Sequence, residues 1–155
     1  MKVNEHNLLE SLKKLNYEPK VQTETNQICV TFEHEGREFP TFLRPLHNGE
    51  LIQILTFVPC NVDSDKILDV ARFLHMLNKE LDVPGFCVDE QSLTVFYRLT
   101  LPALKTEYNP DALEAFMNTS QVVCKSFGTV IEALCVGALT LDEILKKANQ
   151  LKTES

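Results

Sequence analysis

Three residues whose side chains could do chemistry lie close together in the segment FLHMLNKELDVPGFCVD. Cys87 could act as a thiol nucleophile, His75 as its base and Asp89 as the carboxylate that orients the imidazole. Such a site needs the thiol and the imidazole within hydrogen-bonding reach, in surroundings that depress the thiol pKa. The Pro84-Gly85 break separates His75 from the other two, and no glycine cluster or helix start lies beside the cysteine. We therefore expect a small core thiol and a surface histidine.

The other candidate sites are weaker. Five cysteines are spaced 31, 27, 37 and 11 residues apart without a CxxC pair, so they predict neither a disulfide framework nor a zinc site. Cys60, just before an expected helix, is the best single thiol candidate. Two histidines and three glutamates could meet across a hairpin but lack metal-motif spacing: His34, His47, Glu33, Glu35 and Glu50. We expect no catalytic residue, no cofactor and no metal, and hence a protein that is not an enzyme.

Length and composition indicate one folded domain. The chain has 155 residues, of which 44% are hydrophobic and 24% charged, both ordinary for a globular protein. We expect a single domain over residues 1–155. No apolar run approaches the roughly 18 residues that would cross a bilayer. The first 14 residues are polar where a signal peptide needs its apolar centre, so we expect a cytoplasmic protein.

The charge balance disfavours two classes of partner. The formal net charge is −7, from 22 acidic and 15 basic residues, and the basic residues form no long block. Phosphate contacts supply most non-specific affinity for nucleic acid, and an acidic surface repels them. We expect no nucleic-acid binding and no membrane insertion.

The hydrophobic pattern predicts an α+β fold. Helical periodicity alternates with strand-like alternation in the order α-βββ-α-ββ-α-α, which is typical of an antiparallel sheet with helices packed on it. The Asn109-Pro110-Asp111 turn and the box at Thr140–Glu143 predict the starts of the last two helices. The expected helices and strands are at about residues 4–16, 28–32, 37–46, 51–59, 64–82, 86–89, 93–101, 110–136 and from 140.

The expected strand at 51–59 is apolar on both faces, with only Gln53 and Thr56 interrupting it. A strand with water on one side normally alternates apolar and polar residues. Either the helices cover both faces of the sheet, or an apolar surface is left for a second copy or a partner. We expect the second. The residues assigned to that surface are Ile52, Ile54 and Phe96 on the sheet and Phe73 and Met76 on the helix.

Three loose sequence patterns of core and turn residues suggest a family resemblance. They are the helix end Leu74–Asn78, the strand start Gly85–Asp89 and the strand segment Val95–Arg98. With the element order, they make residues 20–150 resemble the YbjN family of small bacterial proteins. That fold is similar to the class I type III secretion chaperones, which are small acidic cytoplasmic homodimers that bind partly unfolded segments of secreted proteins. The resemblance implies a binding protein without chemistry.

Two functions therefore stay open. The first is a type III secretion chaperone-like homodimer that shields apolar segments of a partner protein, for example a secreted effector. The second is a YbjN-like regulatory module that acts on a folded partner and has no role in secretion.

Overall fold

The computed structural model describes residues 1–154, and the side chains of residues 1–151. Within that range it has four α-helices and one six-stranded sheet. The helices are α1 (Glu5–Lys14), α2 (Ile67–Glu80), α3 (Pro110–Cys135) and α4 (Leu141–Glu154). The strands are β1 (Lys20–Gln22), β2 (Gln27–His34), β3 (Arg37–Leu46), β4 (Leu51–Asn61), β5 (Phe86–Asp89) and β6 (Thr94–Pro102).

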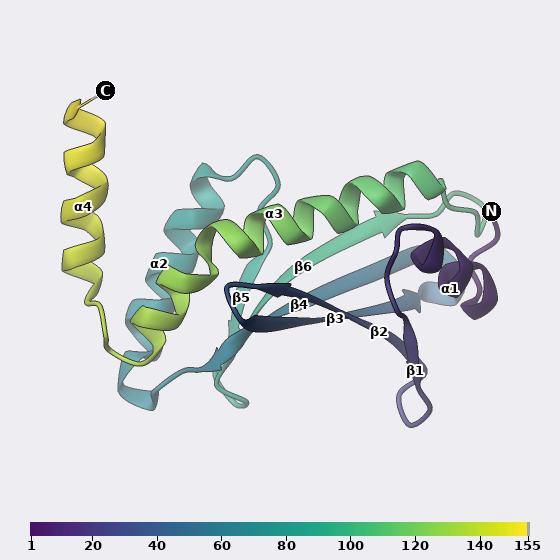
Figure 1. Ribbon diagram of the computed structural model, residues 1–155, viewed down its shortest axis with the longest axis horizontal. Helices are drawn as coiled ribbons and strands as arrows, with labels where there is room; N and C mark the ends of the chain where they lie inside the picture. The colour runs from purple at the N-terminus through teal and green to yellow at the C-terminus, as the bar shows by residue number, and fades with distance from the viewer. Residues whose placement is uncertain (155) are drawn as a thin grey trace.

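The sheet confirms the predicted α+β class. Its strand order is β1-β2-β3-β4-β6-β5, and every neighbouring pair is antiparallel. The α-βββ-α-ββ-α-α order holds, with β1 added before β2. Three residues are too short for alternation to be visible in the sequence, so β1 was not predicted. Figure 1 shows α4 beyond α2, at the opposite end of the molecule from α1.

Polar caps begin three of the helices. The Asn4 side chain accepts a hydrogen bond from the Asn7 amide at 2.8 Å, and Asn109 accepts one from Asp111 at 2.8 Å. At the start of α4 the Thr140 hydroxyl accepts from the Glu143 amide at 3.2 Å. These contacts satisfy amides that have no partner inside the helix. They confirm the two helix starts that the sequence predicts.

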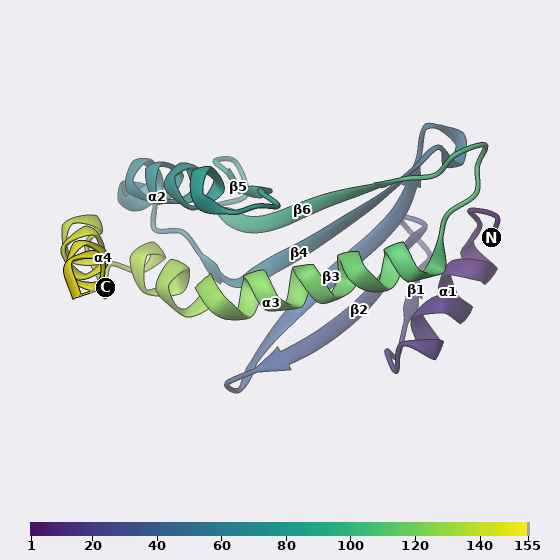
Figure 2. The same cartoon turned by 90° about the horizontal axis from the view of Figure 1, so that it is seen from above.

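Helix α3 packs along one face of the sheet, and the core lies between them (Figure 2). On β4, Ile52 and Ile54 are fully buried on this face, beneath α3. Thr41 and Thr56, also fully buried, face each other across β3 and β4 and satisfy each other through a 3.0 Å contact between their hydroxyls. The two threonines therefore belong to the core face, although their polarity suggests the solvent side.

A clamp fixes the break between α2 and β5. The Asn78 side chain accepts hydrogen bonds from the amides of Gly85 and Phe86 and donates one to the Phe86 carbonyl, at 3.1, 2.9 and 2.9 Å. A Cβ atom at Gly85 would collide with the carbonyl oxygen of Arg98 on β6. Two of the loose sequence patterns thus have a structural cause, because the amide and the glycine together set β5 against β6.

Candidate functional site

The three residues that suggested nucleophilic catalysis do not form a site. His75 is exposed on α2. The half-buried Cys87 on β5 donates a weak hydrogen bond to the Gly85 carbonyl at 3.6 Å. Asp89 accepts from the amides of Gln91 and Ser92 in the β5–β6 turn, and these bonds lower its carboxyl pKa. Within residues 1–151 no hydrogen bond or ion pair joins the three.

The histidines and glutamates that suggested a metal site do not come together. No group of three or more His, Cys, Asp or Glu side chains that could hold a metal ion occurs in the part of the chain that the structure describes. His34 lies 3.7 Å from its neighbour Glu35, in the turn between β2 and β3. His47 lies in the turn between β3 and β4, at the other end of the strands. The expected partners are thus too far apart along the sheet to act together.

The face of the sheet opposite α3 carries an aromatic cluster. Phe42 on β3, Leu55 and Phe57 on β4 and Phe96 on β6 lie on it, and we call these four residues the aromatic face. The Phe42 and Phe57 rings lie edge to face with centroids 5.7 Å apart, and the Phe57 and Phe96 centroids are also 5.7 Å apart. All four side chains are only half-buried and lie outside the hydrophobic core. The four side chains therefore form an apolar cluster that α3 does not cover.

Charged residues flank the aromatic face with opposite signs at its two ends. Arg44, opposite Gln53, and Arg98, opposite Leu55, lie toward one end. At the other end Glu33 on β2 lies directly opposite Glu38 on β3. Asp89 on β5 lies at the same acidic end. All five side chains are exposed, and none of them makes an ion pair within the described residues.

The Glu33–Glu38 pair is unfavourable for the isolated chain. Like charges directly opposite each other in an antiparallel pair destabilise the sheet. Across residues 1–151 neither carboxylate has an ion-pair partner that offsets the repulsion. The arrangement fits a surface whose charges are compensated by a partner.

The structure corrects the predicted contact surface. Ile52 and Ile54 have no exposed area because α3 covers them, so they are core residues. Phe73, on α2, is also buried, at 7% exposed, near residues of α3 and α4. Met76 is half-buried on α2. Phe96 is half-buried on the aromatic face, and its pairing with Phe57 places it on the opposite face of the sheet from Ile54.

Of the four residues of the aromatic face, sequence reasoning assigned only Phe96 to a contact surface and missed Phe42, Leu55 and Phe57. A signal was present in the strands, because residues two apart share a face. Arg44 lies two residues from Phe42, and Arg98 lies two residues from Phe96. The charged residues therefore mark the solvent-facing side, and the aromatic residues share it.

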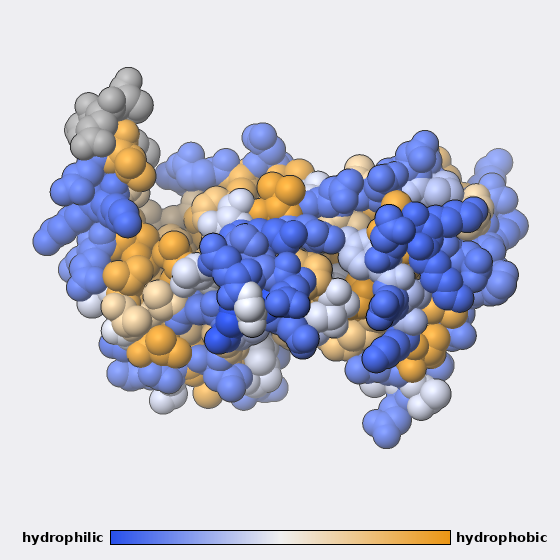
Figure 3. All heavy atoms as spheres, in the orientation of Figure 1, coloured by the Kyte–Doolittle hydropathy of each residue, from blue (hydrophilic) through white to orange (hydrophobic). Residues whose placement is uncertain are grey.

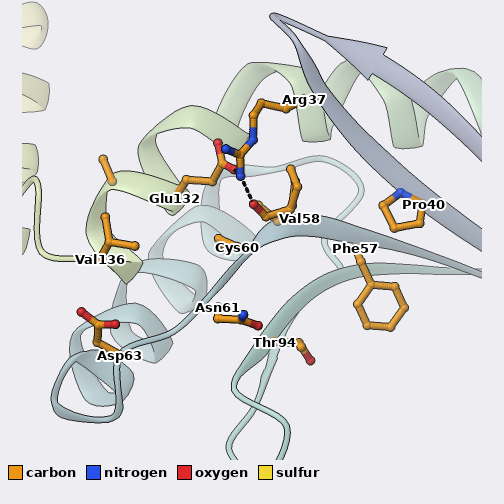
Figure 4. Close-up of a pocket in the computed structure, with 12 residues that line it drawn as sticks. Arg37, Pro40, Phe57, Val58, Cys60, Asn61, Asp63, Thr94, Glu132 and Val136 are labelled. Atoms are coloured by element: carbon orange, nitrogen blue, oxygen red, sulfur yellow. Dashed lines mark hydrogen bonds and ion pairs between the residues drawn. The ribbon is translucent and has the colours of Figure 1, made fainter.

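An open, shallow cavity of about 840 Å³ lies where β4 passes the end of α3 (Figure 4). Arg37 from β3 reaches across it, forms a 2.6 Å ion pair with Glu132 on α3 and donates to the Pro59 carbonyl. Phe57 of the aromatic face and Cys60 also line it. The Sγ atom of Cys60 lies 3.4 Å from that of Cys135, the last residue of α3.

The thiols of this pair influence each other. Cys60 donates a hydrogen bond to Cys135, which lowers the pKa of Cys135 and raises that of Cys60. Cys124 is different, because burial alone raises its pKa to about 12. Cys60, the best thiol candidate from the sequence, thus has a second thiol within contact distance, from a residue 75 positions away.

A second apolar surface lies between α4 and the ends of α2 and α3. This helix groove is open to solvent, has a volume of about 430 Å³ and is lined mainly by apolar side chains, including Phe127, Val130, Ile144 and Leu151. Figure 3 shows apolar atoms where α4 meets the rest of the molecule. Glu143 and Lys147 also line the groove and add one charge of each sign. No helix within residues 1–154 is long and apolar enough to span a membrane.

The comparisons with known proteins agree with this fold. Residues 6–133 match the family model YbjN, described as "Putative bacterial sensory transduction regulator". The structure is similar to the crystal structure of YbjN from E. coli, described as "a putative transcription regulator", with a TM-score of 0.59 and 11% identity over 89% of this chain and 94% of that chain. No curated protein matches. Because the family model covers most of its length, the chain belongs to the YbjN family.

Proposed function

We propose that this protein is a non-enzymatic protein-binding factor and that the aromatic face is its contact surface. The observation that carries the proposal is the half-buried cluster of Phe42, Leu55, Phe57 and Phe96 on the sheet face opposite α3. Aromatic side chains contribute strongly to interface energetics, and they are enriched at contact surfaces.

The occupant that fits this face best is a second copy of the chain. The basic end holds Arg44 and Arg98, and the acidic end holds Glu33, Glu38 and Asp89. A two-fold axis that reverses the strand direction stacks the basic end of one copy over the acidic end of the other. An isologous contact of this kind uses the same patch twice and closes as a dimer. It also compensates the facing glutamates, which have no ion-pair partner within the described residues of one copy.

The helix groove supplies a place for a partner segment in such a dimer. Its apolar lining and volume of about 430 Å³ suit a few apolar side chains of a bound segment. This supports the narrower proposal that the protein is a type III secretion chaperone-like homodimer that shields apolar segments. Phe73, which lines the groove, would act in it as a packing residue, with Met76 on the same helix.

The alternative is a regulatory module that acts on a folded partner. The family model and the E. coli protein are both described as regulators. The aromatic face is suited to contact with the surface of a folded partner. This alternative is therefore favoured if the helix groove binds no apolar segment.

Charge reversal tests the dimer. Arg98→Glu should weaken dimerisation about tenfold, measured by sedimentation equilibrium at low salt. The new glutamate would face the three acidic residues at the acidic end of the second copy and repel them. Adding Glu38→Lys to Arg98→Glu should recover most of the affinity. Lys146→Glu on α4 makes the same change in net charge away from the face and should leave the affinity unchanged. Equal weakening by Lys146→Glu, or no recovery in the double variant, would overturn the arrangement.

A second experiment distinguishes the chaperone-like homodimer from the regulatory module. Wild-type protein should suppress the aggregation of reduced insulin B chain if the groove shields apolar segments. Ile144→Asp, which places a carboxylate in the groove, should abolish that suppression and leave the dimer intact. A wild-type protein that dimerises without suppressing aggregation removes the chaperone proposal and leaves the regulatory module.

A further inference from the structure

Two cysteines far apart in the sequence meet at the end of β4. The Sγ atoms of Cys60 and Cys135 are 3.4 Å apart, and 75 positions separate the residues. A disulfide has a sulfur separation of about 2.05 Å, so the two atoms need to approach by only about 1.4 Å. The backbone is already joined here, because the Asp63 amide donates to the Cys135 carbonyl at 3.0 Å. Bond formation therefore requires side-chain rotation and little movement of the chain.

The two thiols differ in access. Cys60 is half-buried and lines the 840 Å³ cavity, whereas Cys135 has no exposed area. The guanidinium of Arg37 lines the same cavity and offsets part of the rise in the Cys60 pKa that the hydrogen bond to Cys135 and burial cause. A small oxidant that enters the cavity thus meets Cys60 first, with Cys135 directly behind it. This is the arrangement of an attacking thiol and a resolving thiol.

We propose that Cys60 and Cys135 form a reversible disulfide when the protein meets a peroxide. When the pair has released one proton, the proton that Cys60 donates can pass along the hydrogen bond to Cys135 and leave the thiolate on Cys60. The Cys60 thiolate attacks one oxygen of hydrogen peroxide, the O–O bond breaks, and the hydroxide that leaves takes up the proton that the pair released, to form water. Cys60 is left as a sulfenic acid. The Cys135 sulfur then attacks the Cys60 sulfur, the S–O bond breaks, and the second hydroxide leaves as water with the Cys135 proton. Two thiols and one peroxide give one disulfide and two waters, so two electrons pass from the thiols to the peroxide.

The disulfide would tie the end of β4 to the end of α3. Cys135 is followed by the short connection to α4, which forms one wall of the helix groove. Oxidation therefore restrains the end of α3, from which the connection to α4 begins. A cross-link that closes a loop this long restricts the unfolded chain strongly and should raise the thermal midpoint by roughly 10 °C.

The experiment treats the reduced full-length protein with a small excess of hydrogen peroxide. The free thiol count should fall from five to three, and peptide mapping should find one link, between Cys60 and Cys135. Dithiothreitol should restore all five thiols. The matched control Cys87→Ser removes another half-buried cysteine and should form the link at the wild-type rate. In Cys135→Ala, dimedone should trap the sulfenic acid on Cys60.

Other results would overturn the proposal. These are an unchanged thiol count, a link that involves Cys29 or Cys87, or a link only between two molecules. An oxidised wild-type protein whose thermal midpoint does not rise would also overturn it. That measurement needs no variant, so it decides the matter even if Cys135→Ala fails to fold.

Discussion

The two faces of the sheet differ although the same strands build both. On the face toward α3, Ile52, Ile54 and Val58 of β4 are at most 3% exposed. On the opposite face, Leu55 and Phe57 of the same strand stay half-buried. Hydrophobicity alone does not distinguish them. The difference shows that an apolar residue on a strand becomes a core residue only where the chain supplies a cover.

Charge distinguishes the faces better than apolarity does. On the α3 face, Thr41 and Thr56 satisfy each other through their hydroxyls, and the charge of Arg37 is paired with Glu132 on α3. The other face carries arginines at one end and acidic residues at the other. Charged side chains are almost never fully buried unless paired. The combination of exposed charges and clustered aromatic rings is why we propose this face as the contact surface.

The largest expected effect compares adjacent residues of β4. Ile54→Ala should destabilise the protein by about 3 kcal/mol, because it leaves a cavity beneath α3. Leu55→Ala, one residue away on the aromatic face, should cost about 1 kcal/mol at monomeric concentrations, because its side chain is already partly in water. Urea unfolding measures both. Equal losses would mean that the two faces are not energetically distinct.

The next effect concerns β5, which contributes to both faces. Asn78→Ala removes three hydrogen bonds to Gly85 and Phe86 and should cost about 2 kcal/mol in urea unfolding. Asn118→Ala, an exposed asparagine on α3, is the control and should change stability by less than about 0.5 kcal/mol. A loss at Asn78 no larger than the control would show that the clamp does not hold β5.

A smaller effect depends on pH and is specific to the buried face. Tyr97 donates to the Val83 carbonyl at 2.6 Å, and burial raises its pKa from 10.0 to about 12. Because the folded-state pKa lies above the unfolded one, this contribution is complete below pH 10 and is lost as the pH rises to about 12. Tyr97→Phe should cost about 1 kcal/mol at pH 7. It should also reduce the loss of stability between pH 10 and 12, followed by thermal unfolding. A wild-type slope in the variant would contradict this assignment.

The sequence predicted the elements well and their register poorly. The caps at Asn109 and Thr140 are local signals, and both helices start as predicted. The face on which Phe96 lies depends on its pairing with Phe57 on β4. Because a helix and a turn separate the two strands in the sequence, this pairing is not a local property. Thr56, which interrupts the apolar run in the sequence, lies on the core face because its hydroxyl finds a partner in Thr41. The cover over Ile52 and Ile54 comes from α3, more than fifty residues later in the chain.

The cysteine pair lay beyond sequence reasoning for the same reason. Nothing in the spacing of Cys60 and Cys135 suggests a pair, and only the packing of α3 against β4 brings them together. By contrast, Cys87 and His75 are close in the sequence and make no contact with each other in the described hydrogen bonds and ion pairs. Proximity along the chain was therefore a poor guide to chemistry in this fold.

Sedimentation equilibrium of the wild type beside Phe57→Asp tests the central claim most directly. Phe57 lies at the centre of the aromatic face, and Val122, 64% exposed on α3, gives the control Val122→Asp. We expect a wild-type dimer, a dimer for Val122→Asp, and a folded monomer for Phe57→Asp. A wild type that is monomeric at every concentration, or a Phe57→Asp variant that dimerises as tightly as the wild type, would contradict the account.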